Sequence, residues 1–414
     1  MRYGLIGERL GHSFSAEIHA RLKSAPYELC ELAPDALAAF LAERDFCGVN
    51  VTIPYKQAVI PYLDEIDPIA RSVGAVNTVV ARNGRLIGYN TDLFGLQTLL
   101  ESLGVPIAGK TVAILGTGGT SLTARAVAAR MGAGEILRVS RSEGADAVTY
   151  ETFYREYASR VQILINTTPV GMYPKTDASP AMLDRLPSLE AVADVIYNPL
   201  RTQLVLDARK RGLPASGGLL MLTAQAVRAS ELFADVTYPD GTAERLCAEL
   251  AAEKENIVLS GMPGSGKSTV GRLLATELGR CFTDMDEAIT ARTGRTPAEI
   301  LQTDGEAVFR DIETETLAAV LHGLNHAVVA LGGGTILRDR NIDLIRQNGR
   351  VCFLDRPIAD LLPTADRPLS ATRAELERRY TERIDRYLAT ADLVLRELPT
   401  PEAAVTRIRK ELHI

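Results

Sequence analysis

The sequence is poor in the features that mark disulfide-rich, zinc-binding and membrane proteins. Its five cysteines are scattered and form no C-x-x-C pair. An odd and dispersed count indicates reduced thiols in a cytosol, and it argues against a disulfide framework or a zinc site. No apolar run is long enough to span a membrane, and no charged-then-apolar leader follows Met1. We therefore expect a soluble, cytoplasmic protein without a membrane partner.

Basic charge is not in excess either. The formal net charge is −6. Before Asn256, 25 Lys and Arg stand against 29 Asp and Glu, a difference of −4, and the remainder holds 21 against 23, a difference of −2. Neither half is a basic module, so we expect no nucleic-acid partner. With 414 residues, of which 46% are hydrophobic, the chain is long enough for two or three domains with sizeable cores.

The most specific motif is a glycine loop past the middle of the chain. It follows the apolar run 256–260, precedes a helical pattern over 270–278, and reads Gly261, Met262, Pro263, Gly264, Ser265, Gly266, Lys267, Ser268, Thr269. Glycines let backbone N–H groups curl around a phosphate, Lys267 adds a point charge, and the Ser268 hydroxyl can ligate Mg²⁺. A turn that only caps a helix would not explain the lysine and hydroxyl. The loop therefore predicts nucleotide-dependent phosphoryl chemistry.

Two carboxylates follow this loop at the end of the next predicted strand. Asp284 and Asp286 are two residues apart, so they share one face of the strand. One can serve Mg²⁺ and the other a substrate hydroxyl. The alternative, a helix-capping aspartate, fits one of the two.

The first hundred residues carry polar groups at the ends of short strands. Ser13 and Ser15 stand at a strand-to-helix junction, where they can face an anion or simply cap the helix. Lys56 follows a β-branched run; most such lysines are solvated, but lysine can also act as an acid or base. Two Asn-Thr pairs, Asn77-Thr78 and Asn90-Thr91, can recognise a polyol or simply fill ordinary turns. Asp92 follows the second pair.

Taken in order, these groups resemble shikimate dehydrogenase, together with Thr52 and Pro54 before the lysine. The resemblance implies that Ser13 and Ser15 hold a substrate carboxylate. It implies that Thr52, Asn77 and Asn90 bind hydroxyls, and that Lys56 and Asp92 form the catalytic pair at the reacting carbonyl. An ammonium there stabilises the negative charge on the carbonyl oxygen and supplies a proton.

A dinucleotide-type turn follows the buried-strand run 110–115. It contains Gly116, Gly118, Gly119 and Thr120, and a helix is expected over 122–131. The second strand of this region ends in Ser140, Arg141 and Ser142, where an NAD site would have an acid. A guanidinium and two hydroxyls suit a 2′-phosphate, so we predict NADP(H); a solvated surface arginine is the alternative.

The resemblance extends through the rest of this region. It places Thr167 along the cofactor and Gly218 and Met221 near the nicotinamide. It turns Tyr197 toward the joint between two lobes and assigns Gln225 to a substrate hydroxyl. The predicted lobes are 1–100 plus 217–250, which bind substrate, and 101–216, a Rossmann-like lobe for NADP(H), with the active site in the cleft between them.

Residues 256–414 resemble shikimate kinase. The resemblance implies that Asp286 contacts ring hydroxyls and acts as base, and that Arg310 and Arg383 clamp the carboxylate, with Glu313 orienting Arg310. Backbone approaches the ring at Gly332, Gly333 and Gly334. ATP and Mg²⁺ are assigned to the glycine loop, including Lys267 and Ser268, to Asp284, and to Arg367 on a lid.

The fold expected is α/β: a two-lobed dehydrogenase followed by a P-loop kinase domain with a parallel sheet flanked by helices. The predicted function is reduction of 3-dehydroshikimate with NADPH and then phosphorylation of shikimate with ATP. One alternative is a metabolite-sensing regulator derived from such enzymes, although the retained charged residues argue against it. Another is a dehydrogenase that prefers quinate or NAD. The sequence leaves the oligomeric state open.

Overall fold

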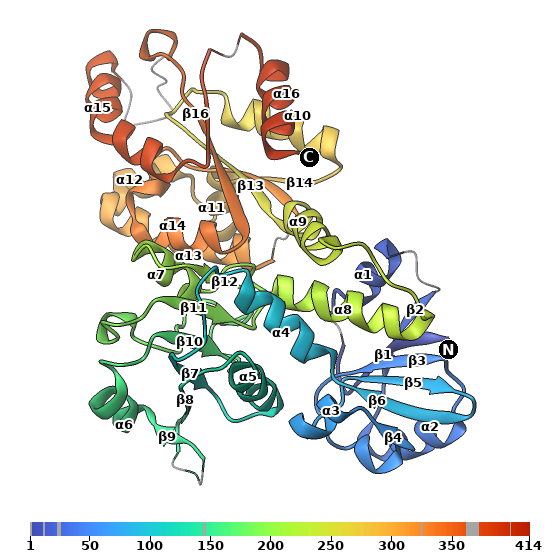
Figure 1. The fold of residues 1–414 in the computed structure, drawn as a ribbon. Helices are drawn as coiled ribbons and strands as arrows, with labels where there is room; N and C mark the ends of the chain where they lie inside the picture. The colour runs from blue at the N-terminus through green and yellow to red at the C-terminus, as the bar shows by residue number, and fades with distance from the viewer. Residues whose placement is uncertain are drawn as a thin grey trace. The chain divides into compact units, whose positions relative to one another are not determined.

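The chain forms two compact units, Met1–Glu249 and Leu250–Ile414 (Figure 1). The computed structural model describes residues 2–10, 13–22, 26–142, 144, 146–323, 326–361, 372–397 and 399–414. The division between the units falls inside helix α9 (Thr242–Lys254), just before residue 256, where the predicted kinase region begins. Across the described ranges, no helix combines the length and apolar character that crossing a membrane requires.

The first sheet of unit 1 has six strands in the order β2-β1-β3-β5-β6-β4. β1 pairs in parallel with β2 and β3, whereas β5 and β6 form an antiparallel hairpin. The strands are β1 (Tyr3–Gly7), β2 (Tyr27–Glu31), β3 (Gly48–Val51), β4 (Glu65–Ile66), β5 (Thr78–Arg82) and β6 (Arg85–Tyr89). Helices α1 (Ser15–Arg21), α2 (Leu37–Glu43) and α3 (Pro68–Val73) connect them.

The second sheet of unit 1 is entirely parallel, with the strand order β12-β11-β10-β7-β8-β9. This is the order of a doubly wound dinucleotide-binding fold, whose switch point lies between its first and fourth strands, here β7 and β10. The strands are β7 (Thr111–Leu115), β8 (Glu135–Ser140), β9 (Val148–Thr149), β10 (Ile163–Asn166), β11 (Ala191–Asp194) and β12 (Ala215–Ser216). Their helices are α5 (Gly119–Arg130), α6 (Tyr150–Thr152) and α7 (Gln203–Lys210).

Alternation along these parallel strands builds a core on each face of the sheet. Val112 and Ile114 pack with α4 (Thr91–Glu101), α5 and α8 (Leu219–Ala234), while Ala113 and Leu115 pack on the opposite side. Strands buried on both faces need continuous apolar runs, which is what the sequence supplies here. The helix α5 begins at Gly119, three residues before the predicted start, so the last glycine of the turn lies in the first helical turn.

Helices α4 and α8 lie side by side and join the two lobes of unit 1 (Figure 1). A Cβ placed on Gly95 of α4 would lie 2.4 Å from the Met221 carbonyl oxygen of α8, so only glycine permits this spacing. Toward its other end, α8 covers the first sheet, where Phe233 stacks on Tyr3 at 5.2 Å.

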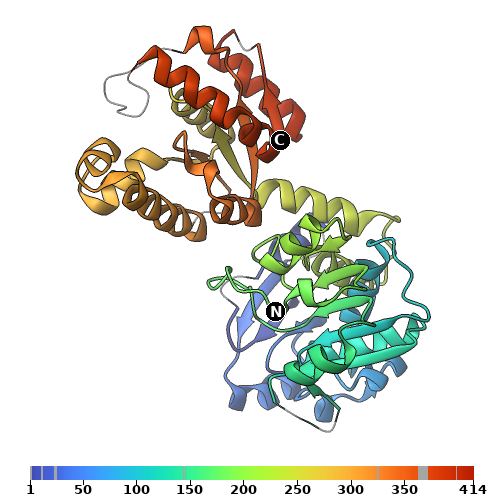
Figure 2. The ribbon, with the colours of Figure 1, turned by 90° about the vertical axis from the view of Figure 1, so that its left-hand side faces the viewer.

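Unit 2 is a five-stranded parallel sheet in the order β14-β15-β13-β16-β17, with helices on both faces (Figure 2). The strands are β13 (Asn256–Ser260), β14 (Cys281–Asp284), β15 (Ala327–Ala330), β16 (Gly349–Leu354) and β17 (Leu393–Leu395). The helices are α10 (Lys267–Leu278), α11 (Met285–Thr293), α12 (Pro297–Thr303), α13 (Gly305–Gly323), α14 (Asp339–Asn348), α15 (Arg373–Thr390) and α16 (Pro401–Leu412).

The central strand β13 again alternates between two cores. Val258 packs toward α13, α14 and α15, whereas Ile257 and Leu259 pack toward α10 and α16. The strand leads directly into the glycine loop and α10, as the sequence predicts for a phosphate-binding unit.

Candidate active sites

A cavity of about 440 Å³ in unit 1 gathers residues that lie up to 220 positions apart in the sequence. It brings together most of the side chains predicted to bind substrate, and it adds Arg9 and Asn50. The predicted residues that line it are Ser13, Ser15, Thr52, Lys56, Asn77, Asp92, Thr120, Tyr197, Gly218, Met221 and Gln225.

Lys56 and Asp92 form an ion pair in this cavity. The Lys56 Nζ donates to Asp92 Oδ2 at 2.6 Å, and the two side chains are 20% and 10% exposed. Lys56 lies in the turn after β3, and Asp92 lies in the first turn of α4, so the pair joins two elements at the cavity wall. A largely buried pair interacts more strongly than a surface pair because less solvent screens it.

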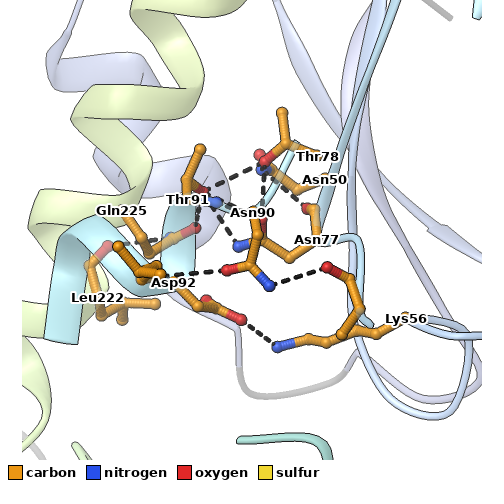
Figure 3. A network of polar contacts seen from close by, with 11 residues as sticks. Asn50, Lys56, Asn77, Thr78, Asn90, Thr91, Asp92, Leu222 and Gln225 are labelled. Atoms are coloured by element: carbon orange, nitrogen blue, oxygen red, sulfur yellow. Dashed lines mark hydrogen bonds and ion pairs between the residues drawn. The ribbon is translucent and has the colours of Figure 1, made fainter. Parts of the chain in front are cut away.

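Hydrogen bonds fix the amide and hydroxyl groups beside this pair (Figure 3). Asn77 Oδ1 accepts from the Thr91 backbone N–H at 2.7 Å, and its Nδ2 donates to Thr91 Oγ1 at 3.0 Å. Asn50 Nδ2 donates to Thr78 Oγ1 at 3.0 Å, and Tyr27 donates its hydroxyl to Asn50 Oδ1 at 2.7 Å. These groups are therefore oriented by the protein before any ligand arrives.

Asn90 occupies a different position from the other predicted hydroxyl-binding residues. Its Oδ1 accepts from the Leu93 N–H at 3.1 Å and caps α4, while its Nδ2 donates to the Ala75 carbonyl at 2.9 Å. Among the described residues that line the cavity, Asn90 is absent. This capping role agrees with the alternative that Asn90 is an ordinary turn residue. A contact between Asn90 and the substrate stays a prediction.

The dinucleotide turn leaves open space before α5. Gly116 has φ of 107°, and a Cβ there would lie 2.9 Å from Thr167 Oγ1. Gly118 and Gly119 have no atom within 4 Å of an added Cβ, so the backbone before the helix faces open space. A phosphate suits such a helix start because its N–H groups point outward.

Two features of this lobe were not recognised from sequence. Arg138 Nη2 donates to the Thr117 carbonyl at 3.1 Å and to Ser121 Oγ at 3.3 Å, so it braces the turn from β8. Ser140, Arg141 and Ser142 follow at the end of that strand, and the last two are exposed. Nothing in the spacing of Arg138 distinguishes it from a surface arginine.

The second unrecognised feature is a buried carboxylate, Asp194, at the end of β11. Its Oδ1 accepts from Asn166 Nδ2 at 2.9 Å and from the Ile196 N–H at 3.0 Å, and Thr202 donates to its Oδ2 at 2.7 Å. Burial raises the pKa of Asp194 to about 6, although these donors favour the charged form. The group ties the loop after β10 to the loop that carries Tyr197.

The glycine loop of unit 2 has the conformation that the sequence predicts. Gly266 has φ of 92° and stands at the start of α10. Lys267 donates to the carbonyls of Gly261 and Met262 at 2.9 Å each. Ser268 donates to Asp284 Oδ2 at 2.5 Å, so two candidate Mg²⁺ ligands lie together. Asp284 also caps α11 through the Asp286 N–H at 2.9 Å, as the capping alternative foresaw for one aspartate.

A cavity of about 970 Å³ adjoins this loop and contains the predicted shikimate-site residues of unit 2. They are Asp286, Arg310, Glu313, Gly332, Gly333, Gly334 and Arg383, beside Lys267, Ser268 and Asp284. Arg310 is buried, and its Nη1 donates to Glu313 at 2.7 Å while Nη2 donates to Glu306 at 3.1 Å. A Cβ on Gly334 would lie 2.2 Å from Arg310 Nη2, so the glycine makes room for the guanidinium.

The two buried arginines of this cavity, Arg310 and Arg383, differ in the direction of their pKa shifts. Burial alone would lower the pKa of Arg310, but the Glu313 carboxylate raises it above its ordinary value. Burial lowers the pKa of Arg383, whose Nη1 donates to the Gly333 carbonyl at 3.0 Å. Thr335 in turn donates to Glu313 Oε1 at 2.6 Å, which holds the acid in place.

A further cavity of about 390 Å³ lies on the other side of the glycine loop. Its lining includes Ser265, Gly266, Asp355, Arg356 and Pro399. It was not predicted from the sequence, because apart from the glycine loop and α10 its walls come from the segments around residues 354–360 and 395–404, which carry no motif. The predicted lid residue Arg367 lies outside the described residues.

The residues present fit the expected cofactors. The open backbone before α5 suits a dinucleotide, and the glycine loop suits nucleotide phosphates. Within the described ranges, no group of three or more His, Cys, Asp or Glu could hold a metal ion. A Mg²⁺ ion on Ser268 and Asp284 would therefore complete its oxygen shell with water and nucleotide phosphate.

The sheet order and cavity of unit 1 define a two-lobed oxidoreductase of the dinucleotide-binding class, and unit 2 is a P-loop phosphotransferase fold. Residues 5–79 match the shikimate dehydrogenase substrate binding domain, and residues 263–413 match shikimate kinase. The shikimate dehydrogenase (NADP(+)) of Clostridium beijerinckii is 36% identical over 245 residues, which covers 56% of this chain and 91% of that protein. The chain belongs to the shikimate dehydrogenase family and carries a shikimate kinase domain after it.

Solved structures agree with this assignment. Shikimate 5-dehydrogenase from Thermus thermophilus in complex with NADP(H) and shikimate superposes with a TM-score of 0.54 at 31% identity, over 60% of this chain and 99% of that chain. A chorismate mutase/shikimate 5-dehydrogenase fusion protein from Clostridium acetobutylicum gives 0.56 at 31% identity, over 60% and 96%.

Proposed function

We propose that this chain reduces 3-dehydroshikimate to shikimate with NADPH and then phosphorylates shikimate to shikimate 3-phosphate with ATP. The observation that carries the proposal is the presence of two cavities with charged side chains in their walls, one holding the Lys56–Asp92 pair and the other the Arg310–Glu313 pair beside a phosphate-binding loop. Each cavity has the groups that a small hydroxylated acid requires.

In unit 1 the side chains divide into binding and proton-transfer groups. Ser13 and Ser15 bind the carboxylate, and Thr52, Asn77, Asn90, Tyr197 and Gln225 bind or face the ring and its hydroxyls. NADPH supplies the hydride. The carbonyl oxygen then gains negative charge, which the Lys56 ammonium stabilises and neutralises by donating a proton from Nζ. Asp92, at 2.6 Å, keeps that ammonium oriented.

The NADP(H) site follows the carboxyl edge of the second sheet. Gly116, Gly118, Gly119 and Thr120 approach the pyrophosphate, and Ser140, Arg141 and Ser142 bind the 2′-phosphate. Thr167 lies along the cofactor, and Gly218 and Met221 lie near the nicotinamide. Arg141 makes no ion pair with a described residue, so its charge is free for this role.

In unit 2 the groups position two reactants. Arg310 and Arg383 clamp the carboxylate, Gly332, Gly333 and Gly334 approach the ring, and Asp286 accepts the proton of the attacking hydroxyl. ATP supplies the phosphoryl group. Lys267 and the loop residues Gly261, Gly264, Ser265, Gly266 and Thr269 neutralise and hold its phosphates, with Mg²⁺ on Ser268 and Asp284. Arg367 is proposed to close over the nucleotide.

The domain limits proposed are 1–100 with 217–250, 101–216, and 256–414. We place the enzyme in the cytoplasm, where reduced thiols, NADPH and ATP are available.

A coupled assay tests the proposal. With 3-dehydroshikimate, NADPH and ATP, both NADPH loss and ADP release should occur, and omitting NADPH should abolish ADP release. Supplying shikimate directly should restore ADP release without NADPH. A regulator would bind the acid without turnover, and a faster reaction with NADH or quinate would instead support the other dehydrogenase. Absence of either reaction would overturn the bifunctional assignment.

A further inference from the structure

We propose that Arg9 is a specificity-determining residue of the first cavity, where it pairs with the carboxylate of the substrate. The proposal rests on the function proposed above, because it takes the ligand of this cavity to be a small cyclic acid. Arg9 is not among the residues that the family resemblance assigns to the site.

The position of Arg9 is fixed by its neighbours. It lies just after β1, at the cavity wall formed also by Ser13 and Ser15. On one side the Leu10 N–H donates to Glu31 Oε1 at 2.7 Å, and Ser13 donates its N–H to the Leu10 carbonyl at 3.1 Å. After Arg9 the backbone is thus tied to β2 and to Ser13, and before it the Glu8 N–H donates to the Ile53 carbonyl at 3.4 Å, so the side chain starts from a defined point on the wall.

Charge makes this residue distinct. Three charged side chains are among the described residues that line the cavity. Two of them, Lys56 and Asp92, form an ion pair at 2.6 Å, so their charges cancel. The third, Arg9, is exposed and makes no hydrogen bond or ion pair with any described residue. The cavity wall therefore carries one uncompensated positive charge.

A carboxylate in this cavity otherwise faces neutral partners. Ser13 and Ser15 offer hydroxyls, and Ser13 Oγ already donates to Ser15 Oγ at 3.1 Å. Hydroxyls discriminate poorly between an acid and its neutral analogue, because both accept hydrogen bonds. A guanidinium discriminates well, since its paired N–H donors match the two carboxylate oxygens and its charge attracts only the anion. The structure assigns that discrimination to Arg9.

Arg9→Gln tests the proposal, because glutamine keeps a polar side chain and removes the charge. Shikimate and shikimate methyl ester are oxidised with NADP⁺, so the reacting hydroxyl is the same and only the carboxylate differs. We expect the KM for shikimate to rise about tenfold with little change in kcat, and the KM for the ester to stay unchanged. Arg9→Lys should retain part of the preference for the acid.

Arg71→Gln is the matched control, because this exposed arginine of α3 lies outside the cavity and loses the same charge. Phosphorylation of shikimate in the same samples reports the amount of folded protein. Equal rises in KM for acid and ester, or no rise for either, would overturn the role of Arg9.

A binding titration tests the assignment of Arg9 independently of whether the proposed redox reaction occurs. Shikimate should show two affinities, one weakened by Arg9→Gln and the other by Arg310→Lys. Should the wild type bind the acid without oxidising it, the proposed redox activity fails, yet the titration still decides the assignment of Arg9. If neither affinity changes in Arg9→Gln, the assignment is wrong.

Discussion

The two cavities present positive charge to one class of ligand in different ways. In unit 1 the wall carries hydroxyls, amides and one cancelled ion pair, with a single exposed arginine at the edge. In unit 2 two buried arginines stand in the wall, and Arg310 is held by Glu313 at 2.7 Å. The same carboxylate would thus meet two hydroxyls and one exposed guanidinium in unit 1, and two buried guanidinium groups in unit 2.

The difference follows from the chemistry each cavity must support. A ketone that accepts hydride gains one transient charge, so a single well-placed proton donor is enough. A phosphoryl transfer brings an anionic acid close to an anionic nucleotide, and buried positive groups must offset that repulsion. We therefore expect the permanent charge of the second wall to serve substrate binding, and the ion pair of the first wall to serve the reaction itself.

The largest expected effect concerns the ion pair of unit 1. Lys56→Ala should lower kcat/KM of the redox step about 10³-fold, because it removes the proton donor. Phosphorylation of shikimate should continue at the wild-type rate. Steady-state kinetics of both reactions on one preparation would check this, and equal loss of both would show that the units are not independent.

The buried carboxylates sharpen the comparison, because Glu313 has an arginine partner while Asp194 has hydrogen-bond donors without charge. The pKa of Asp194 is raised from 3.8 to about 6. Its contribution to stability is therefore present below pH 3.8 and is lost as the pH rises through 6, a change of about 3 kcal/mol.

Asp194→Asn removes this titration because an amide does not ionise. The amide has a similar shape, and its oxygen can still accept hydrogen bonds from Asn166 and Ile196. The unfolding free energies of wild type and variant are then compared at pH 4 and pH 7. The wild type should lose stability between these two pH values through this group, and the variant should not. Parallel pH curves would contradict the raised pKa.

Arg310→Lys tests the clamp of unit 2. A lysine keeps the charge but cannot form the same two hydrogen bonds to Glu313 and a carboxylate, so the KM for shikimate in the kinase reaction should rise about 10- to 150-fold. The redox step should not change. Arg292→Gln, which removes an exposed arginine of α11, serves as the control.

The smallest effect is expected at the cofactor. Arg141→Ala should raise the KM for NADPH about tenfold and leave the KM for NADH nearly unchanged, because only NADPH carries a 2′-phosphate. Initial rates at varied cofactor concentration would measure the ratio. If the ratio of the KM values for NADPH and NADH is the same in wild type and variant, Arg141 does not bind the 2′-phosphate.

Sequence patterns predicted the parts of each site that lie at strand ends. The glycine loop before Lys267 and the strand that ends at Asp284 have the predicted form because local spacing determines it. Lys56 and Asp92, which are 36 residues apart, were brought together by resemblance, and the structure places them in contact.

Other features depend on tertiary packing and were not predictable. The sequence could not show that Asn90 turns back to cap α4, since capping and binding use the same side-chain groups. It could not show that Asp194 is fully buried, because an acid at a strand end is usually solvated. Arg138 reaches its partners across the sheet, beyond any local pattern.

The close approach at Gly95 has a mechanical consequence. The chain passes between the lobes of unit 1 twice, once between α4 and β7 and once between β12 and α8. Because α4 and α8 pack closely against each other, we expect Asp92 on α4 and Gln225 on α8 to keep a fixed spacing. We therefore expect any opening of the cleft to be a hinge rotation, with the two connections at residues 102–110 and 217–218 absorbing the change in backbone angles.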